Sequence, residues 1–214
     1  MLLDENCTEQ EAMKTLQNIY AKEIEKYGKE NVVVLLPYRK KGICSNALNN
    51  RLQRIANSER SGYRHYCKAD DNTLFFMKHD LVMQLSNRDE CANGDVGEVL
   101  DVSPRGVLVN FNDKEVLYSL DDLDQLCLAY AMTVHKSQGS EYKSVIVCMM
   151  NCHIAMLTRN LLYTGITRAK KECTVVYQQK AFTTAIATIA EASRITMLKE
   201  KLRTCYMQYK AVCG

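Results

Sequence analysis

Two short runs of consecutive apolar residues constrain the fold of this chain more than any other feature. VVVLLP occupies 32–37 and VIVCMM occupies 145–150, and β-branched residues make up half of each run. Such uninterrupted runs are typical of strands that are buried on both faces of a parallel sheet. Both are far shorter than the ~18 residues needed to cross a bilayer. The runs therefore predict an α/β domain with a parallel sheet at its centre.

Segments with the spacing of amphipathic helices lie beside these runs. Apolar residues recur mostly at three- or four-residue intervals within 8–27 and again within 46–56. Later in the chain, NLLYTGITRAK (160–170) indicates another helix, CTVVY (173–177) indicates another strand, and 181–211 has a helical composition. This alternation of strands and helices predicts a parallel sheet with helices on both faces.

The sequence changes character between residues 73 and 120. Turn residues there separate five short apolar runs: LFFM, DLVMQL, GEVLDV, GVLVNF and EVLYSL. Short strands at such close spacing predict a small antiparallel β-barrel. We therefore expect a barrel at 73–126, inserted into one α/β domain that is built from 1–72 and 127–214.

The charges of the chain are nearly balanced but unevenly placed. The formal net charge is +3. Five basic residues and no acid lie within 39–54, whereas 113–124 holds five acids and one lysine. Such asymmetry suits a surface that steers a polyanion to one face, although ordinary solvated faces explain it equally well.

Ten cysteines are scattered along the chain, and no CxxC pair occurs among them. The nearest candidate ligand group, Cys148, Cys152 and His153, lacks a second pair, so we expect neither a metal nor disulfides. The first residues, MLLDENCTEQEAMK, carry acids where a signal peptide has a basic start and an apolar core. We therefore expect a soluble, cytoplasmic protein without a membrane partner.

One dense group of polar residues, TVHKSQGSEY (133–142), comes directly before the second apolar run. Ligands of open α/β sheets bind at loops beside strand ends, so this position favours a functional role. The hydroxyls and His135 suit hydrogen bonds to phosphate oxygens, and Gln138 and Glu141 suit a nucleotide sugar or a metal-bound water. The alternative, a polar turn that closes a helix, explains Gly139 but not the number of donors.

A second group, LLYTGITRAKK (161–171), combines an apolar stripe with threonines and basic residues. A single arginine on a helix is usually a surface residue. Arg168, however, lies beside small and hydroxyl residues just before a buried strand, a setting that suits a guanidinium held rigidly toward phosphate.

Taken together, these segments resemble the motifs of a known protein family. AYAMTVHKSQGSEYKSVIV closely resembles motif V of superfamily-one DNA helicases of the RecD type (exodeoxyribonuclease V alpha-subunit-like), and LLYTGITRAKKECTVV resembles their motif VI. VVVLLPYRKKG with NALNNRLQ resembles their motif IV region, and DLVMQLSN with NGDVGEV resembles the Src-homology-3-like barrel of their second motor domain. The resemblance covers about 30–180 in the order of the family. It implies a RecA-like, P-loop-NTPase-type domain with that barrel inserted. One departure is Lys78-His79-Asp80, where the family usually has Gly-Asp entering the barrel.

The resemblance also implies roles for individual residues, because ATP in this family sits between two RecA-like domains. It implies that Arg168 is the motif VI arginine finger and that Arg39 is the motif IV arginine, both directed at the γ-phosphate. ATP contacts are implied for Gln138, Gly139 and Glu141. Contacts with single-stranded DNA are implied for Thr133, His135, Lys136, Ser137, Tyr163 and Thr164.

No stretch of the sequence matches the phosphate-binding pattern GxxxxGK[ST]. In the family this Walker A motif belongs to the first RecA-like domain, which would hold most of the ATP and Mg²⁺. We therefore expect the C-terminal motor half of an ATP-dependent single-stranded-DNA translocase, inactive alone, with a Walker A domain in cis or in trans as its partner. Two alternatives stay open: a single-strand binding module independent of ATPase activity, and half of a viral-type RNA helicase.

Overall fold

A parallel sheet forms the centre of the computed structural model, which describes residues 1–38, 42–57, 64–69, 72–189 and 202–203. Within these residues the strand order is β1-β12-β11-β2-β10, and every pair is parallel. The strands are β1 (Leu2–Leu3), β2 (Val32–Leu36), β10 (Ala131–Thr133), β11 (Tyr142–Met149) and β12 (Ala169–Gln178). All residues of β2 and nearly all of β11 are buried, which confirms the two strands predicted from the apolar runs.

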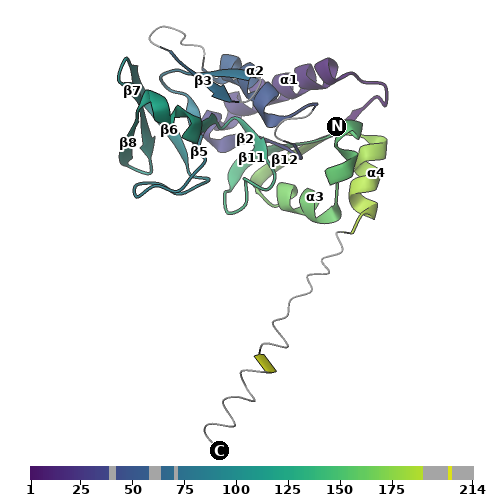
Figure 1. Ribbon diagram of the computed structural model, residues 1–214. Helices are drawn as coiled ribbons and strands as arrows, with labels where there is room; N and C mark the ends of the chain where they lie inside the picture. The colour runs from purple at the N-terminus through teal and green to yellow at the C-terminus, as the bar shows by residue number, and fades with distance from the viewer. Residues whose placement is uncertain (39–41, 58–63, 70–71, 190–201, 204–214) are drawn as a thin grey trace, which may run out of the picture.

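Helices cover both faces of this sheet, as predicted. They are α1 (Glu9–Tyr27), α2 (Ser45–Ala56), α3 (Arg159–Ile166) and α4 (Gln179–Ala187). In β11 the Ser144 hydroxyl donates to a Glu23 carboxylate oxygen of α1 at 2.6 Å. A Cβ at Gly165 of α3 would lie 3.4 Å from Val147. Because alternate residues of a strand point to opposite faces, Ser144 and Val147 place α1 and α3 on opposite sides, as Figure 1 shows.

The third helix ends earlier than the sequence predicted. The apolar pattern indicated a helix to residue 170, but α3 ends at Ile166 and β12 begins at Ala169. The Tyr142 amide donates to the Arg168 carbonyl at 2.9 Å, and Tyr142 pairs with Ala169. Pairing with β11 therefore takes these residues into the sheet.

The middle of the chain forms an antiparallel sheet, seen at one end of the molecule in Figure 1. Its order is β8-β7-β6-β5-β9. The strands are β5 (Leu81–Gln84), β6 (Val96–Ser103), β7 (Gly106–Phe111), β8 (Lys114–Tyr118) and β9 (Leu126–Leu128). The predicted LFFM strand is β4 (Asn72–Phe76), which pairs with β3 (His65–Ala69) in a separate hairpin.

The expected closed barrel is not seen. Among the described residues, β8 and β9 are the edges of an open sheet, and the short helix η2 (Leu120–Gln125) connects them. The prediction counted β4 among the barrel strands, but β4 pairs outside this sheet. The sheet instead gains β9, which continues past the boundary expected at residue 126.

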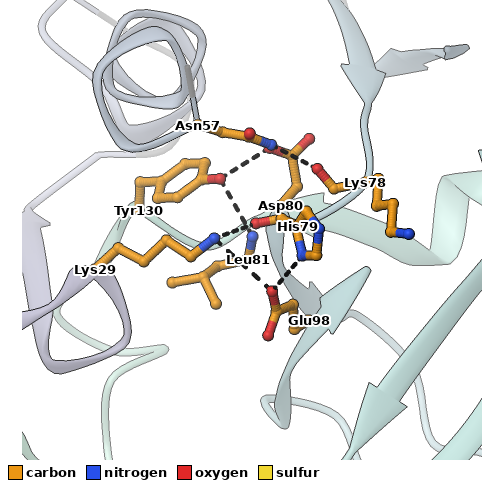
Figure 2. Close-up of polar contacts among 8 residues, drawn as sticks. All are labelled: Lys29, Asn57, Lys78, His79, Asp80, Leu81, Glu98 and Tyr130. Atoms are coloured by element: carbon orange, nitrogen blue, oxygen red, sulfur yellow. Dashed lines mark hydrogen bonds and ion pairs between the residues drawn. The ribbon is translucent and has the colours of Figure 1, made fainter. Parts of the chain in front are cut away.

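A buried carboxylate joins the antiparallel sheet to the α/β part of the chain. Asp80, fully buried just before β5, accepts hydrogen bonds from the Tyr130 hydroxyl (2.8 Å) and the Asn57 amide (2.9 Å) on one oxygen. Its other oxygen accepts from the Gln53 amide (2.6 Å) and the Met77 backbone N–H (2.8 Å). Burial raises the pKa of Asp80, and the four donors oppose that rise. Figure 2 shows this carboxylate facing Tyr130 and Asn57.

The turn beside Asp80 contains the departure from the family sequence. His79 has φ of 68°, a left-handed conformation that favours glycine. Lys29 Nζ donates to the His79 carbonyl at 2.6 Å, and His79 Nδ1 lies 3.0 Å from a Glu98 carboxylate oxygen, as Figure 2 shows. These contacts hold the turn in this conformation although His79 carries a Cβ.

None of the helices in the described ranges combines the length and the apolar character that crossing a membrane requires.

Candidate functional site

The loop 134–141, which we call the motif V loop, carries most of the predicted site residues between β10 and β11. It begins as a tight turn, because the Lys136 and Ser137 amides both donate to the Thr133 carbonyl, at 3.0 and 3.2 Å. The Ser137 hydroxyl donates to the Val134 carbonyl at 2.7 Å, and Ser137 is fully buried. The predicted contact between Ser137 and DNA does not fit this placement, because the hydroxyl hydrogen already closes the turn.

The outer rim of the motif V loop is available to a ligand. His135, Gln138, Gly139 and Glu141 are exposed, and Thr133 is half-buried at the end of β10. Within the described part of the chain, the side chains of His135 and Gln138 make no hydrogen bond to protein groups. Gly139 has φ of 86°, so the loop needs glycine at this turn.

Arg168 reaches from the end of α3 to the motif V loop. Its Nη1 donates to the Ser140 carbonyl at 3.2 Å, and its Nε donates to the Thr164 carbonyl at 3.2 Å. Its Nη2 donates to the Thr167 hydroxyl at 3.4 Å. A guanidinium has five N–H donors, so these contacts fix its orientation and leave one N–H on each terminal nitrogen. The structure therefore brings the two motifs together at Arg168.

A second pair connects the same two segments. Lys170 Nζ lies 2.9 Å from a Glu141 carboxylate oxygen. The hydrogen bond from Lys170 lowers the pKa of Glu141, and the charge of Arg168 adds to this effect. Glu141 is thus ionised beside two cations, at the start of β11 and β12.

The two arginines expected at one phosphate are neighbours of strand ends at opposite edges of the sheet. Arg168 precedes Ala169, which pairs with Tyr142 at the amino-terminal edge of the sheet. Arg39 lies outside the described residues, but the strand before it ends at Leu36, paired with Thr133 at the carboxyl edge. These edges are separated by the length of β2, roughly 16 Å at ~3.3 Å per residue. Because Arg39 itself is not described, its contact with the same phosphate as Arg168 stays a prediction.

The remaining predicted residues lie on α3. Tyr163 is 69% exposed and points away from the core. Thr164 lines a surface pocket together with His135 and Gln138. On the other side of the motif V loop, His135, Lys136 and Gln138 line a second hollow, which the β5–β6 connection at 93–95 completes. The rim of the loop therefore separates two hollows.

His153 is a buried polar residue whose role the sequence did not reveal. Its Nδ1 accepts from the Met150 N–H at 3.1 Å and its Nε2 donates to the Ile43 carbonyl at 2.7 Å, so the neutral ring joins η3 (Asn151–Met156) to the segment after β2. Burial lowers the pKa of His153. The sequence offered His153 only as a metal ligand, with Cys148 and Cys152. In the described part of the chain no cluster of three or more His, Cys, Asp or Glu side chains suits a metal ion.

Comparison with known proteins identifies the family to which this chain is similar. Residues 128–176, which include both motifs, match the family described as the UvrD-like helicase C-terminal domain. The chain is 35% identical over 174 residues to the ATP-dependent RecD2 DNA helicase of Deinococcus radiodurans, in an alignment that covers 80% of this chain and 23% of that protein. It is 39% identical over 111 residues to the RecBCD enzyme subunit RecD of Haemophilus influenzae, covering 51% of this chain and 16% of that protein. This chain is a homologue of the C-terminal domain of RecD-type helicases.

The fold of this RecD-type domain recurs in solved helicase structures. The Pif1 helicase from Candida albicans matches with a TM-score of 0.53 and 15% identity, over 96% of this chain and 60% of that chain. The Bacteroides Pif1 helicase, in complex with ADP-AlF3 and ssDNA, matches with a TM-score of 0.50 and 15% identity, over 95% of this chain and 51% of that chain. The domain spans less than a quarter of the length of the curated relatives named above.

Proposed function

We propose that this domain is the C-terminal motor half of an ATP-dependent translocase or helicase that acts on single-stranded DNA. The contact between Arg168 and the Ser140 carbonyl carries this proposal. This contact holds the Arg168 guanidinium between motif V and motif VI. Two of the five N–H groups of the guanidinium remain without a protein partner among the described residues. A fixed guanidinium with spare donors suits a developing phosphate charge, because little side-chain freedom is then lost in the transition state.

In this proposal Mg²⁺ and the triphosphate are held mainly by a Walker A domain, in cis or in trans. Arg168 completes the site as an arginine finger, and Glu141 lies on the same edge of the sheet. Gln138 and Gly139 follow on the exposed rim of the motif V loop. Mg²⁺-bound ATP supplies the phosphoryl group, and this chain supplies charge stabilisation and orientation.

The DNA strand is proposed to lie along the motif V loop. Thr133, His135 and Lys136 lie at or just after the carboxyl end of β10, and Thr164 faces the same pocket as His135. Contacts of this kind with the backbone hold a strand without reading its sequence. We further propose that 73–126 is an insert between 1–72 and 127–214, and that the antiparallel sheet formed mainly by this insert extends the DNA track.

One observation favours a second function, a single-strand binding module without ATPase activity. Three of the five N–H donors of Arg168 already bond to protein oxygens, so Arg168 also serves to join α3 to the motif V loop. A domain that used Arg168 only in this way would need no nucleotide.

The ATP turnover of a fusion protein distinguishes the two proposed functions. The chain would be joined to the amino-terminal motor domain of the Deinococcus radiodurans relative, and ATP turnover would be measured with and without single-stranded DNA. We expect DNA-stimulated turnover that Arg168→Ala lowers by about 10³-fold. The matched control is Arg159→Ala, because Arg159 is the first residue of α3, the helix that precedes Arg168, and bonds the Ile186 carbonyl. Turnover unaffected by Arg168→Ala would contradict the arginine finger, whereas a fusion protein that binds the strand without DNA-stimulated turnover would leave the binding module as the function.

A further inference from the structure

The pocket between the motif V loop and α3 has an apolar floor. Its volume is about 370 Å³, within the ~300–1,000 Å³ that is usual for small-molecule sites. Val134 and Leu161, both buried, form part of the floor. A Cβ at Gly165 would lie 3.7 Å from Val134, so α3 and the motif V loop approach each other closely here.

Five polar side chains line the pocket: those of His135, Gln138, Thr158, Asn160 and Thr164. The Thr158 hydroxyl oxygen accepts from the Leu161 N–H at 3.2 Å. Among the described residues, the other four side chains have no hydrogen-bond partner in the protein. The pocket lining contains no carboxylate, ammonium or guanidinium group. The pocket thus offers an apolar surface and a neutral rim of donors and acceptors.

The apolar floor and the neutral polar rim of the pocket indicate which ligand it can bind. Phosphate sites use cations or converging backbone N–H groups, and divalent cation sites use carboxylates. The lining has no charged group, and at the N-terminus of α3 the N–H groups of Arg159 and Leu161 already donate to the Thr188 carbonyl and the Thr158 hydroxyl, so neither ion suits this lining. A nucleobase has two apolar faces and an edge of donors and acceptors, which match the floor and the rim. We propose, on the basis of the proposed strand-binding function, that this pocket holds one unstacked nucleobase of the bound single strand.

The position of the pocket supports the same ligand. His135 and Gln138 line this neutral pocket on one side and the hollow that contains Lys136 on the other. A strand on the rim can therefore place a phosphate toward Lys136 and turn its base toward α3. Hydroxyl, amide and imidazole groups both donate and accept, so the rim tolerates each of the four bases.

The test compares strands with and without bases. Fluorescence anisotropy would measure the binding of the full chain to an oligothymidylate and to a strand of equal length and charge with abasic central positions. We expect the oligothymidylate to bind about tenfold more tightly, since base contacts of this type are worth ~1.4 kcal/mol or more. Ala155→Phe, at an exposed lining position, should fill the pocket and abolish this preference. It should leave binding of the abasic strand unchanged.

The matched control is Ala187→Phe, which adds the same side chain at an exposed position on α4, outside the pocket. It should keep the preference of the unmodified chain. Equal binding of both strands by the unmodified chain would overturn the pocket while leaving the proposed function intact. A preference that survives Ala155→Phe would also overturn it. If neither strand binds, the proposed function fails and the pocket fails with it.

Discussion

At the scale of single residues, buried polar side chains hold the backbone of the site segments in place. His153 and Ser137 are fully buried, and each bonds a backbone carbonyl of a segment that belongs to a predicted motif. Satisfying a buried polar group in this way avoids a desolvation cost of ~1–3 kcal/mol. Such residues shape the site without facing the ligand, so their substitution is expected to change stability first.

For His153, the dependence of the unfolding free energy on pH tests this expectation. Burial lowers its pKa, so the unfolded chain takes up a proton first, near the ordinary value of ~6.5. The unfolding free energy is therefore unaffected above that pH and falls as the pH drops through the window down to the folded-state pKa. Its slope there approaches ~1.4 kcal/mol per pH unit. His153→Gln, which keeps a donor for the Ile43 carbonyl, should remove this slope.

Urea unfolding between pH 5 and 8, followed by circular dichroism because the chain has no tryptophan, measures the effect. The matched control is His135→Gln, since His135 is exposed on the motif V loop. It should keep the slope of the unmodified chain. A slope that persists in His153→Gln would show that another group titrates.

At the scale of elements, the sequence predicted those strands whose burial on both faces requires apolar residues. β2 and β11 followed from apolar runs because strands buried on both faces tolerate few polar residues. The closed barrel did not follow, because closure depends on which strand pairs with which, and β4 pairs with β3. In the site, the exposed rim of the motif V loop was predicted from its polar residues. The role of Ser137 was not, since its partner is a backbone carbonyl that composition cannot reveal.

At the junction between the two sheets, we expect Asp80 to contribute strongly to stability. Asp80 accepts four hydrogen bonds and donates none, so its site suits a carboxylate. Asp80→Asn turns an NH₂ group toward two of those donors, and we expect a loss of about 2–3 kcal/mol in unfolding free energy. Asp101→Asn, at an exposed position of β6, is the matched control and should change stability by less than ~0.5 kcal/mol. Equal urea midpoints for the two variants would contradict a central role for Asp80.

At the scale of the whole molecule, the net charge of +3 is too small to bind a polyanion by long-range attraction alone. The acidic segment 113–124 further limits any general attraction. Binding should therefore depend on local contacts at the motif V loop. Neutral contacts then affect only the affinity, whereas charged contacts also affect its salt dependence.

The corresponding prediction concerns oligonucleotide titrations at several salt concentrations. Replacing both Thr133 and His135 by Ala should weaken binding by ~1 kcal/mol for each neutral bond lost, with the salt slope nearly unchanged, because neutral groups release few counterions. Lys136→Gln should lower the slope by about 0.7, the value for one contact with a single-strand phosphate. Lys180→Gln, an exposed lysine on α4 away from the loop, is the control and should leave affinity and slope unchanged. Unaltered affinity in the folded double variant would place the strand on another surface of the domain.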